Sequence, residues 1–380
     1  MTFSSGSTGA DGALNITTPG VTYFNPQAMN LNPAVPNIFN FTTITIAAGA
    51  TLKLTEEVFH GPAFFLASGS VDIEGSLDLS GAAGPLGTQN QSDRMPSYAG
   101  SGGYGGGLGG WINGGPPGPE AGNGPGGGAA GTVSSSVGSG GQFTGNQYLV
   151  PLIGGSGGGG SYCGSSNGGQ FAGAGGAGGG AILIASSTTI TVNGTINANG
   201  GSSGNSCNFS GGGSGGAVRL VANTVNGSGA IQDVGSGGAS CCFYPVEAGS
   251  GYVRLEAYQR NFTGNINGPF AQSVPYSLAL PATAPSSITV TSINGVAINA
   301  NPFSFPDTTI NTSSPVVINI QAQYIPPGTV PTLTIFSETG PDQVITASPL
   351  SGTLQQSTST VNITFPTGGS RGFVKATWSQ

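Results

Sequence analysis

A motif that returns along the chain constrains the fold of this protein more than any other feature of its sequence. Its clearest copy is GGGAILIASSTTITVNGTINANGG, residues 178–201, in which an apolar run is followed by an alternating run and by glycines. The apolar run of this copy begins at Ala181, and further copies begin at Ala217, 36 residues later, and at Tyr252, another 35 residues later. Self-similarity at a few tens of residues indicates stacked repeats, because one such unit cannot bury its apolar side alone.

Within a copy, apolar residues alternate with polar ones, which is the period of a β-strand. Ile190, Val192 and Ile196 share one parity, and Thr191 and Asn193 share the other. The three aliphatic residues are therefore predicted to lie in the core, and the threonine and asparagine to face outward. No long stretch has the apolar spacing of a helix.

An earlier copy, GPAFFLASGSVDIEGSLDLSG, starts at Gly61. With one residue skipped after Gly69, it aligns Phe64 with Ile182 and Val71 with Ile190. Four copies of one strand pattern favour a parallel β-helix, that is, a solenoid with long glycine-rich loops.

The expected organisation has four parts. An N-terminal cap over 1–40 is followed by the β-helix over 41–271, which carries a glycine-rich insertion at about 81–180. A proline-rich linker over 272–286 leads to an immunoglobulin-like β-sandwich over 287–380, predicted from short strands separated by turn residues. The strand candidates of this last part are 287–293, 316–325, 332–336, 343–347, 360–365 and 373–378.

Composition excludes several classes of protein. Charged residues make up 6% of the chain, the net charge is −7, and the seven Lys and Arg residues form no basic stripe, so nucleic acid is not an expected partner. No apolar stretch is long enough for a membrane span. Glycine, at 72 of 380 residues, lacks the strict three-residue period of collagen. The N-terminus has no features of a signal peptide, so either such a segment was removed or export uses another route.

Four cysteines, Cys163, Cys207, Cys241 and Cys242, lie in glycine- and serine-rich connections. Cys207 and Cys241 occupy comparable positions after successive copies, so we expect a disulfide from Cys207 to Cys241 or Cys242, with Cys163 taking the remaining partner. Free thiols or a metal site are the alternatives. Zinc is disfavoured because no CxxC spacing is present and the one histidine, His60, is distant in sequence.

Aromatic residues lie among the glycines of the insertion, and two interpretations are open. They can form a sugar-stacking or adhesive surface, or they can hold the glycine-rich segments against the repeat stack. The segments themselves can be disordered, or they can pack side by side as extended polyglycine-type helices. The binding candidates are Tyr98, Tyr104, Trp111, Tyr162, Arg219 and Arg254.

Enzymatic chemistry would need carboxylates that converge on one bond. Asp72, Glu74 and Asp78 have outward parity, but they align with Thr191, Asn193 and Asn197 rather than with other acids. Arg219 and Arg254 align with each other, with Glu256 nearby, and are expected on the outer wall. We expect no catalytic residue, no metal site and no cofactor.

The segments GNQYLVPLIGGSGGGG, GGAGGGAILIASSTTITVNGTINANGG and SGGAVRLVA resemble those of uncharacterised, glycine-rich, secreted β-helix proteins of environmental bacteria. The resemblance covers roughly residues 10–270, with the last ~95 residues as a similar companion domain. It implies a right-handed parallel β-helix and an extracellular or cell-surface location.

Together these features predict an extracellular structural or adhesive surface protein. Its expected partners are a surface glycan or other copies of the chain, joined end to end or by strand addition into a filament or layer. The alternatives are a polysaccharide lyase or hydrolase and the receptor-binding tip of a phage-type fibre. Ice binding would require a flat threonine array, hinted at by residues 42–45 and 188–191.

Overall fold

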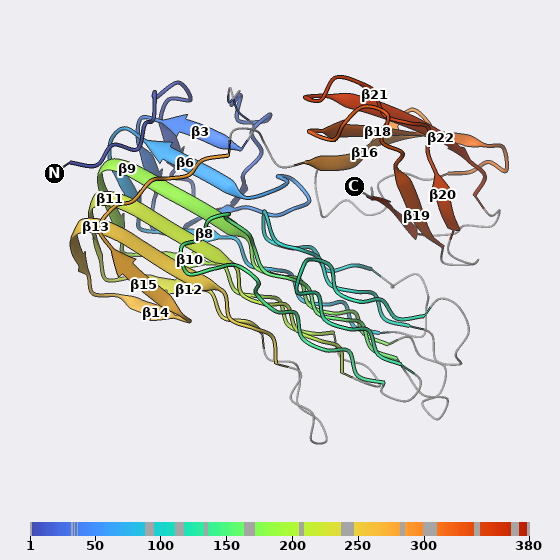
Figure 1. Ribbon diagram of the computed structural model, residues 1–380, viewed down its shortest axis with the longest axis horizontal. Coiled ribbons are helices and arrows are strands. Elements are labelled where there is room, and N and C mark those ends of the chain that lie inside the picture. The colour runs from blue at the N-terminus through green and yellow to red at the C-terminus, as the bar shows by residue number, and fades with distance from the viewer. Residues whose placement is uncertain are drawn as a thin grey trace. The chain divides into compact units, whose positions relative to one another are not determined.

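A computed structural model gives the fold (Figure 1). It describes residues 2–31, 33, 35, 37–87, 95–110, 118–132, 136–162, 172–204, 209–236, 247–281, 286–298, 310–337, 343–365 and 372–377. The chain divides into two compact units, the first ending at Leu280 and the second beginning, for the most part, at Pro281. Every element of the described residues is a β-strand.

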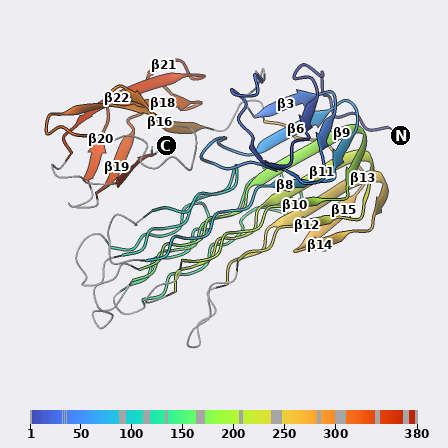
Figure 2. The ribbon, with the colours of Figure 1, turned by 180° about the vertical axis from the view of Figure 1, so that it is seen from behind.

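The first unit is built from two parallel sheets, which both ribbon views show as stacked arrows (Figures 1 and 2). Successive strands of the main path follow the repeat, and from Ala181 onward each copy adds one long strand to one sheet and one short strand to the other. The nine-stranded sheet contains β1 (Leu14–Ile16), β3 (Ile38–Phe41), β4 (Ile44–Ile46), β6 (Ala63–Ala67), β7 (Val71–Ile73), β9 (Ala181–Val192), β11 (Ala217–Gly227), β13 (Tyr252–Phe262) and β15 (Phe270–Ser273). The six-stranded sheet contains β2 (Gly20–Tyr23), β5 (Ala50–Lys53), β8 (Ser76–Asp78), β10 (Thr195–Asn197), β12 (Ala230–Gln232) and β14 (Asn265–Asn267).

One apolar core lies between the two parallel sheets. Ile190, Val192 and Ile196 are fully buried in it, whereas Asn193 is exposed and Thr191 is half-buried, so the predicted strand parity is confirmed. The opposite face of the nine-stranded sheet carries a second apolar cluster that includes Leu183 and Val221. This sheet is therefore covered on both faces, which explains why β6 and the first half of β9 are continuous apolar runs rather than alternating ones.

The register corrects the sequence alignment of the earliest copy. Val71 pairs with Ile190 as expected, but Phe64 lies opposite Leu183 rather than Ile182. A constant offset of 119 residues holds from Ala63–Ile182 through Val71–Ile190, so no residue is skipped at Gly69. The expected spacing of the later copies is confirmed, because Ala217 pairs with Ala181 on one side and with Tyr252 on the other.

The expected right-handed parallel β-helix is wrong, because the described residues form no closed solenoid. After β8, β10 and β12 the chain does not enter a third sheet that would close each turn. It leaves instead in glycine-rich segments, whose backbone hydrogen bonds go to one another. The first unit is thus a pair of stacked parallel sheets, with glycine-rich excursions lying side by side next to them (Figures 1 and 2).

The second unit consists of two antiparallel sheets. A core that includes Ile318, Ile320, Leu333 and Ile363 draws residues from both. Each of the six strand candidates predicted for this part of the chain overlaps a strand, and the bounds of 287–293 match in full, whereas those of the other five differ by one to three residues at one or both ends. The five-stranded sheet contains β16 (Ser287–Ile293), β17 (Val296–Ala297), β18 (Val316–Gln323), β21 (Ser351–Gly352) and β22 (Ser357–Ile363), and the three-stranded sheet contains β19 (Thr332–Ser337), β20 (Gln343–Thr346) and β23 (Gly372–Thr377).

Candidate functional site

The glycine-rich segments form an ordered bundle in which hydrogen bonds recur every third residue. Tyr104 donates its backbone N–H to the carbonyl of Gly155, Gly107 to that of Gly158 and Gly110 to that of Ser161, with N–O distances of 3.0, 2.9 and 3.0 Å. Three residues per turn is the period of the polyproline II helix, which has no internal hydrogen bonds and therefore offers all its amides to neighbours. This arrangement matches the side-by-side polyglycine packing considered from the sequence.

Segment 154–162 lies at the centre of this glycine bundle. Its backbone exchanges hydrogen bonds with six other described segments, so each of its faces is occupied by another stretch of chain. The six segments are 102–110, 120–123, 128–131, 136–139, 173–179 and 211–214. Segments far apart in the sequence are therefore joined through their backbones rather than through side chains.

Glycine is required where these segments approach one another. A Cβ atom on Gly158 would overlap the carbonyl oxygen of Gly211, and one on Gly160 would overlap the carbonyl oxygen of Leu108. Only a residue without a side chain permits this approach. The bundle is consequently a backbone lattice with very little apolar side-chain core.

The aromatic binding candidates have different surroundings in the bundle. Tyr162 is buried, and the half-buried ring of Tyr104 lies against Gly124. Burial raises the pKa of the Tyr104 hydroxyl, and the nearby charge of Glu56 adds to this shift. Tyr98 is half-buried. Trp111 and the four cysteines lie outside the described residues, so the disulfide prediction stays a prediction.

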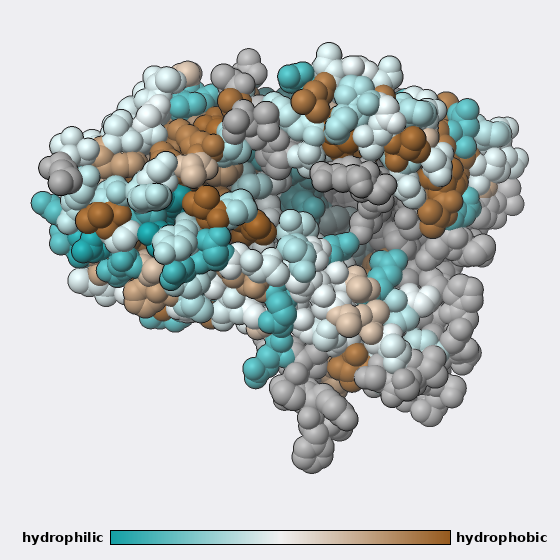
Figure 3. Space-filling model, viewed as in Figure 1, coloured by the Kyte–Doolittle hydropathy of each residue, from teal (hydrophilic) through white to brown (hydrophobic). Residues whose placement is uncertain are grey.

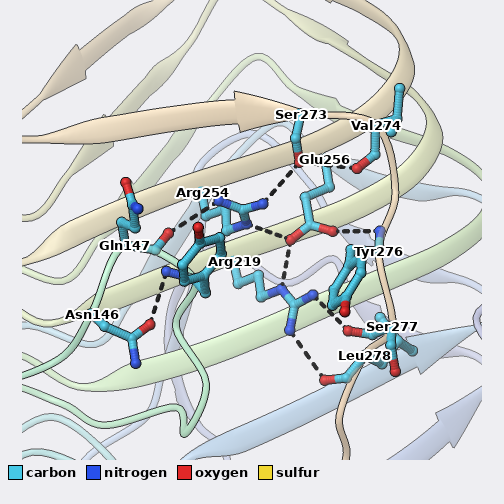
Figure 4. Close-up of polar contacts among 11 residues, drawn as sticks. Asn146, Gln147, Arg219, Arg254, Glu256, Ser273, Val274, Tyr276, Ser277 and Leu278 are labelled. Carbon is cyan, nitrogen blue, oxygen red and sulfur yellow. Dashed lines mark hydrogen bonds and ion pairs between the residues drawn. The ribbon is translucent and has the colours of Figure 1, made fainter.

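Two arginines and one glutamate form a polar cluster on the nine-stranded sheet (Figure 4). Arg219 on β11 and Arg254 on β13 are register partners, as the sequence predicted. The Nε atoms of both donate to the Glu256 Oε1 atom, at 2.9 Å from Arg219 and 2.6 Å from Arg254. Rather than lining a solvated outer wall, Arg219 is 1% exposed, Arg254 7% and Glu256 not at all.

The remaining nitrogens of the cluster hold two other parts of the chain against the sheet. Arg219 donates to the carbonyl oxygens of Ser277 and Leu278, and Arg254 donates to the carbonyl of Gln147 and the hydroxyl of Ser273 (Figure 4). The second carboxylate oxygen accepts the backbone N–H of Tyr276 at 2.8 Å. The arginine–glutamate cluster therefore joins the sheet, the loop at 146–150 and a strap formed by residues 273–280.

Two tyrosines at this cluster are exposed, and sequence reasoning did not single them out as binding residues. Tyr148 is 56% exposed and its ring lies over the Arg254 guanidinium, 5.2 Å from centroid to Cζ, while Tyr276 is 71% exposed. An exposed aromatic ring beside a guanidinium is a surface on which a sugar or another planar group can stack. The local signal was Tyr148 in the apolar run YLVPLI and Tyr276 in the proline-rich linker.

The acids considered for catalysis are engaged one by one. Asp78 forms an ion pair of 2.7 Å with Lys53, Asp72 accepts the hydroxyl of Ser70 at 2.9 Å, and Glu74 accepts the amide of Asn193 at 2.8 Å. Within the described ranges, no group of three His, Cys, Asp or Glu residues could hold a metal ion.

Asp233 is a buried acid that the sequence analysis missed. The residue is 0% exposed, and among the described residues neither carboxyl oxygen has a hydrogen-bond partner. The carboxyl group lies against Gly268, where a Cβ atom would overlap it. Burial raises the pKa of Asp233 from 3.8 to about 7, and its own backbone amide opposes the shift. The sequence signal was its place in the repeat. Gln232 aligns with Asn197, so Asp233 occupies the position that the buried Ala198 has in the preceding copy.

Comparison with known proteins yields no relative: no family model matches the chain, and no curated protein or solved structure is significantly similar to it. The part of the chain that the structure describes contains no helix that is long and apolar enough to cross a membrane.

Proposed function

We propose that this chain is an extracellular structural or adhesive surface protein, in which the stacked sheets and the glycine bundle serve as a rigid support. The observation that carries the proposal is the central segment 154–162, which is hydrogen-bonded to six neighbouring segments. A lattice closed by backbone hydrogen bonds resists local bending, because each segment is fixed by several others. Such a support suits a protein whose task is to hold a surface in place.

The surface chemistry supports the same proposal. Only 6% of residues are charged, and hydrophobic and hydrophilic residues are interspersed on the face seen in Figure 3. A surface of this kind depends on hydroxyl, amide and aromatic groups for contacts, and these are the groups that recognise sugars. The resemblance to secreted bacterial proteins points to the same setting.

For the partner we propose a surface glycan, taken up at the arginine–glutamate cluster. Tyr148 and Tyr276 present exposed rings there, and their backbones are fixed by Asn146 and Glu256. Rings held in this way lose little conformational entropy when a sugar stacks on them.

The test combines location with binding. Surface biotinylation of intact producing cells should label the protein, and the purified full chain should bind members of a glycan array. The double variant Tyr148→Ala/Tyr276→Ala should lose the glycan signal, whereas Val21→Ala, at an apolar residue that is 58% exposed on β2, should keep it. If the protein is intracellular and binds no glycan, the proposal is contradicted. If the wild type binds only other copies of the chain, self-association replaces glycan binding as its interaction.

A further inference from the structure

Within the described residues, only half of β13, the last strand of the main repeat, is paired on both sides. On one side β11 pairs along the whole of β13, but on the other side β15 pairs only with Val253–Glu256. Among the described strands, none pairs with residues 257–262 on that side. This half of β13, together with β14 in the second parallel sheet, forms the C-terminal edge of the stack.

An arginine stands in an apolar column at this edge. Leu14, Ile44, Val71, Ile190 and Val225 occupy one register position on successive strands, and all five are buried. The next residue in the column, paired with Val225, is Arg260, which is exposed. The column therefore ends in a cation at the place where a further strand would have to add its aliphatic residue.

Side-chain contacts of Arg260 and of neighbouring residues lie along this edge. Its Nη1 atom donates to the carbonyl oxygen of Ala257 at 2.6 Å, at the residue where pairing with β15 has ended. Two residues after Arg260 on the same strand, the partly buried Phe262 packs against the core, and its ring lies near Gly264. On the neighbouring sheet, the side chain of Asn265 donates to that of Asn267 along the edge strand at 2.8 Å.

We propose that Arg260 keeps this edge from pairing with a second copy of the chain. A strand added here would trap the guanidinium group between Val225 and the incoming residue, without water and without a carboxylate partner. Burial of an unpaired charge is strongly unfavourable, and a charged residue that points inward at an edge strand is a known protection against strand addition. The C-terminal edge of the stack is therefore not the joint of a β-continuous filament.

The test compares self-association of Arg260→Val with that of two matched variants. Valine restores the residue type of the column, so Arg260→Val should associate at least about tenfold more tightly than the wild type in sedimentation and light scattering. Gln259→Val adds an apolar residue at the preceding, exposed position and should leave the wild-type behaviour unchanged. Arg260→Lys keeps the charge and should also behave as the wild type.

Two outcomes would overturn the proposal. One is a folded Arg260→Val protein, by circular dichroism, that associates no more than Gln259→Val. The other is independent of any variant: amide hydrogen exchange of peptide 257–262 in the wild type should be the same at low and high protein concentration. Slower exchange at high concentration would show that the wild-type edge does pair.

Discussion

At the residue scale, Asp233 places a carboxylic acid where earlier repeats carry Leu79 and Ala198, both buried. The described segments that lie against residues 232–234 are 198–200, 213–216, 249–251 and 267–269, and they contain no charged residue. Nothing in them compensates a negative charge, so the neutral acid is the form that fits the folded protein.

The pH dependence of stability follows from this. The folded-state pKa of Asp233 is about 7, and the ordinary value is 3.8. The contribution of the neutral Asp233 carboxyl group to the free energy of unfolding is therefore fully present below pH 3.8 and is lost as the pH rises through 7. The difference between these two pKa values corresponds to a loss of stability on the order of 4 kcal/mol. Denaturant unfolding between pH 4 and 8 should show this loss for the wild type relative to Asp233→Ala, which restores the residue of the preceding repeat. The control Asp72→Ala should follow the wild type, and identical pH profiles of the wild type and Asp233→Ala would contradict the prediction.

Glu256 gives a second prediction at this scale. The single carboxylate serves two buried guanidinium groups, so Glu256→Gln leaves two cations without an anion and should lower the free energy of unfolding by about 3–5 kcal/mol. Limited proteolysis should then cut the strap at 273–280 earlier than in the wild type. Glu247→Gln, at an exposed acid, is the matched control and should change the free energy of unfolding by less than about 0.5 kcal/mol. Equal effects of the two variants would mean that the cluster does not hold the strap.

At the element scale, the glycine bundle should be intolerant of a single methyl group where segments meet. Gly158→Ala would drive its Cβ into the Gly211 carbonyl, so the variant should lose about 1–3 kcal/mol or more and lose hydrogen-exchange protection over 154–162. Gly118→Ala is the matched control, because among the described residues no atom outside its chain neighbours lies within 4 Å of a Cβ at that position. Unchanged protection in Gly158→Ala would show that the bundle is looser than its hydrogen bonds imply.

Strands were predictable from the sequence, whereas for the bundle side-by-side packing was one of the alternatives and the partner of each segment was not predictable. The alternation around Ile190 fixes which side chains are buried, because a slip of one residue would expose all of them. Phe64 was placed one residue off because the run Ala63–Ala67 is buried on both faces, so parity carries no information there. In segment 154–162 the partners are backbone groups, and a run of glycines does not specify which other segment it bonds. The closed solenoid was wrong for this reason: the pattern predicts strands, not the course of the chain between them.

The candidate site was predictable in part. The pairing of Arg219 with Arg254 follows from the repeat, and Glu256 lies two residues further on the same strand. Their burial does not follow from it, because it depends on the strap and on the loop at Gln147, which contact the cluster from distant positions in the sequence. The same limit applies to Tyr276, whose place at the cluster depends on a hydrogen bond of its backbone.

At the scale of the whole molecule, the two units have separate cores. Ile190 belongs to the core between the parallel sheets, and Ile320 to the core of the antiparallel unit, and both are essentially fully buried. A unit that buries its own core can unfold on its own. The full chain should therefore unfold in two thermal transitions rather than one.

Matched core variants assign these transitions. Ile190→Ala and Ile320→Ala remove the same atoms from the two cores, and each should cost about 2–5 kcal/mol in its own unit. In differential scanning calorimetry, Ile190→Ala should lower one transition temperature and Ile320→Ala the other, with the remaining transition unchanged in each case. Because only the first unit contains Asp233, the transition that Ile190→Ala lowers should also be the one that moves down as the pH rises from 4 to 8. A single transition that both variants shift equally would show that the units unfold together and that the second one stabilises the parallel stack.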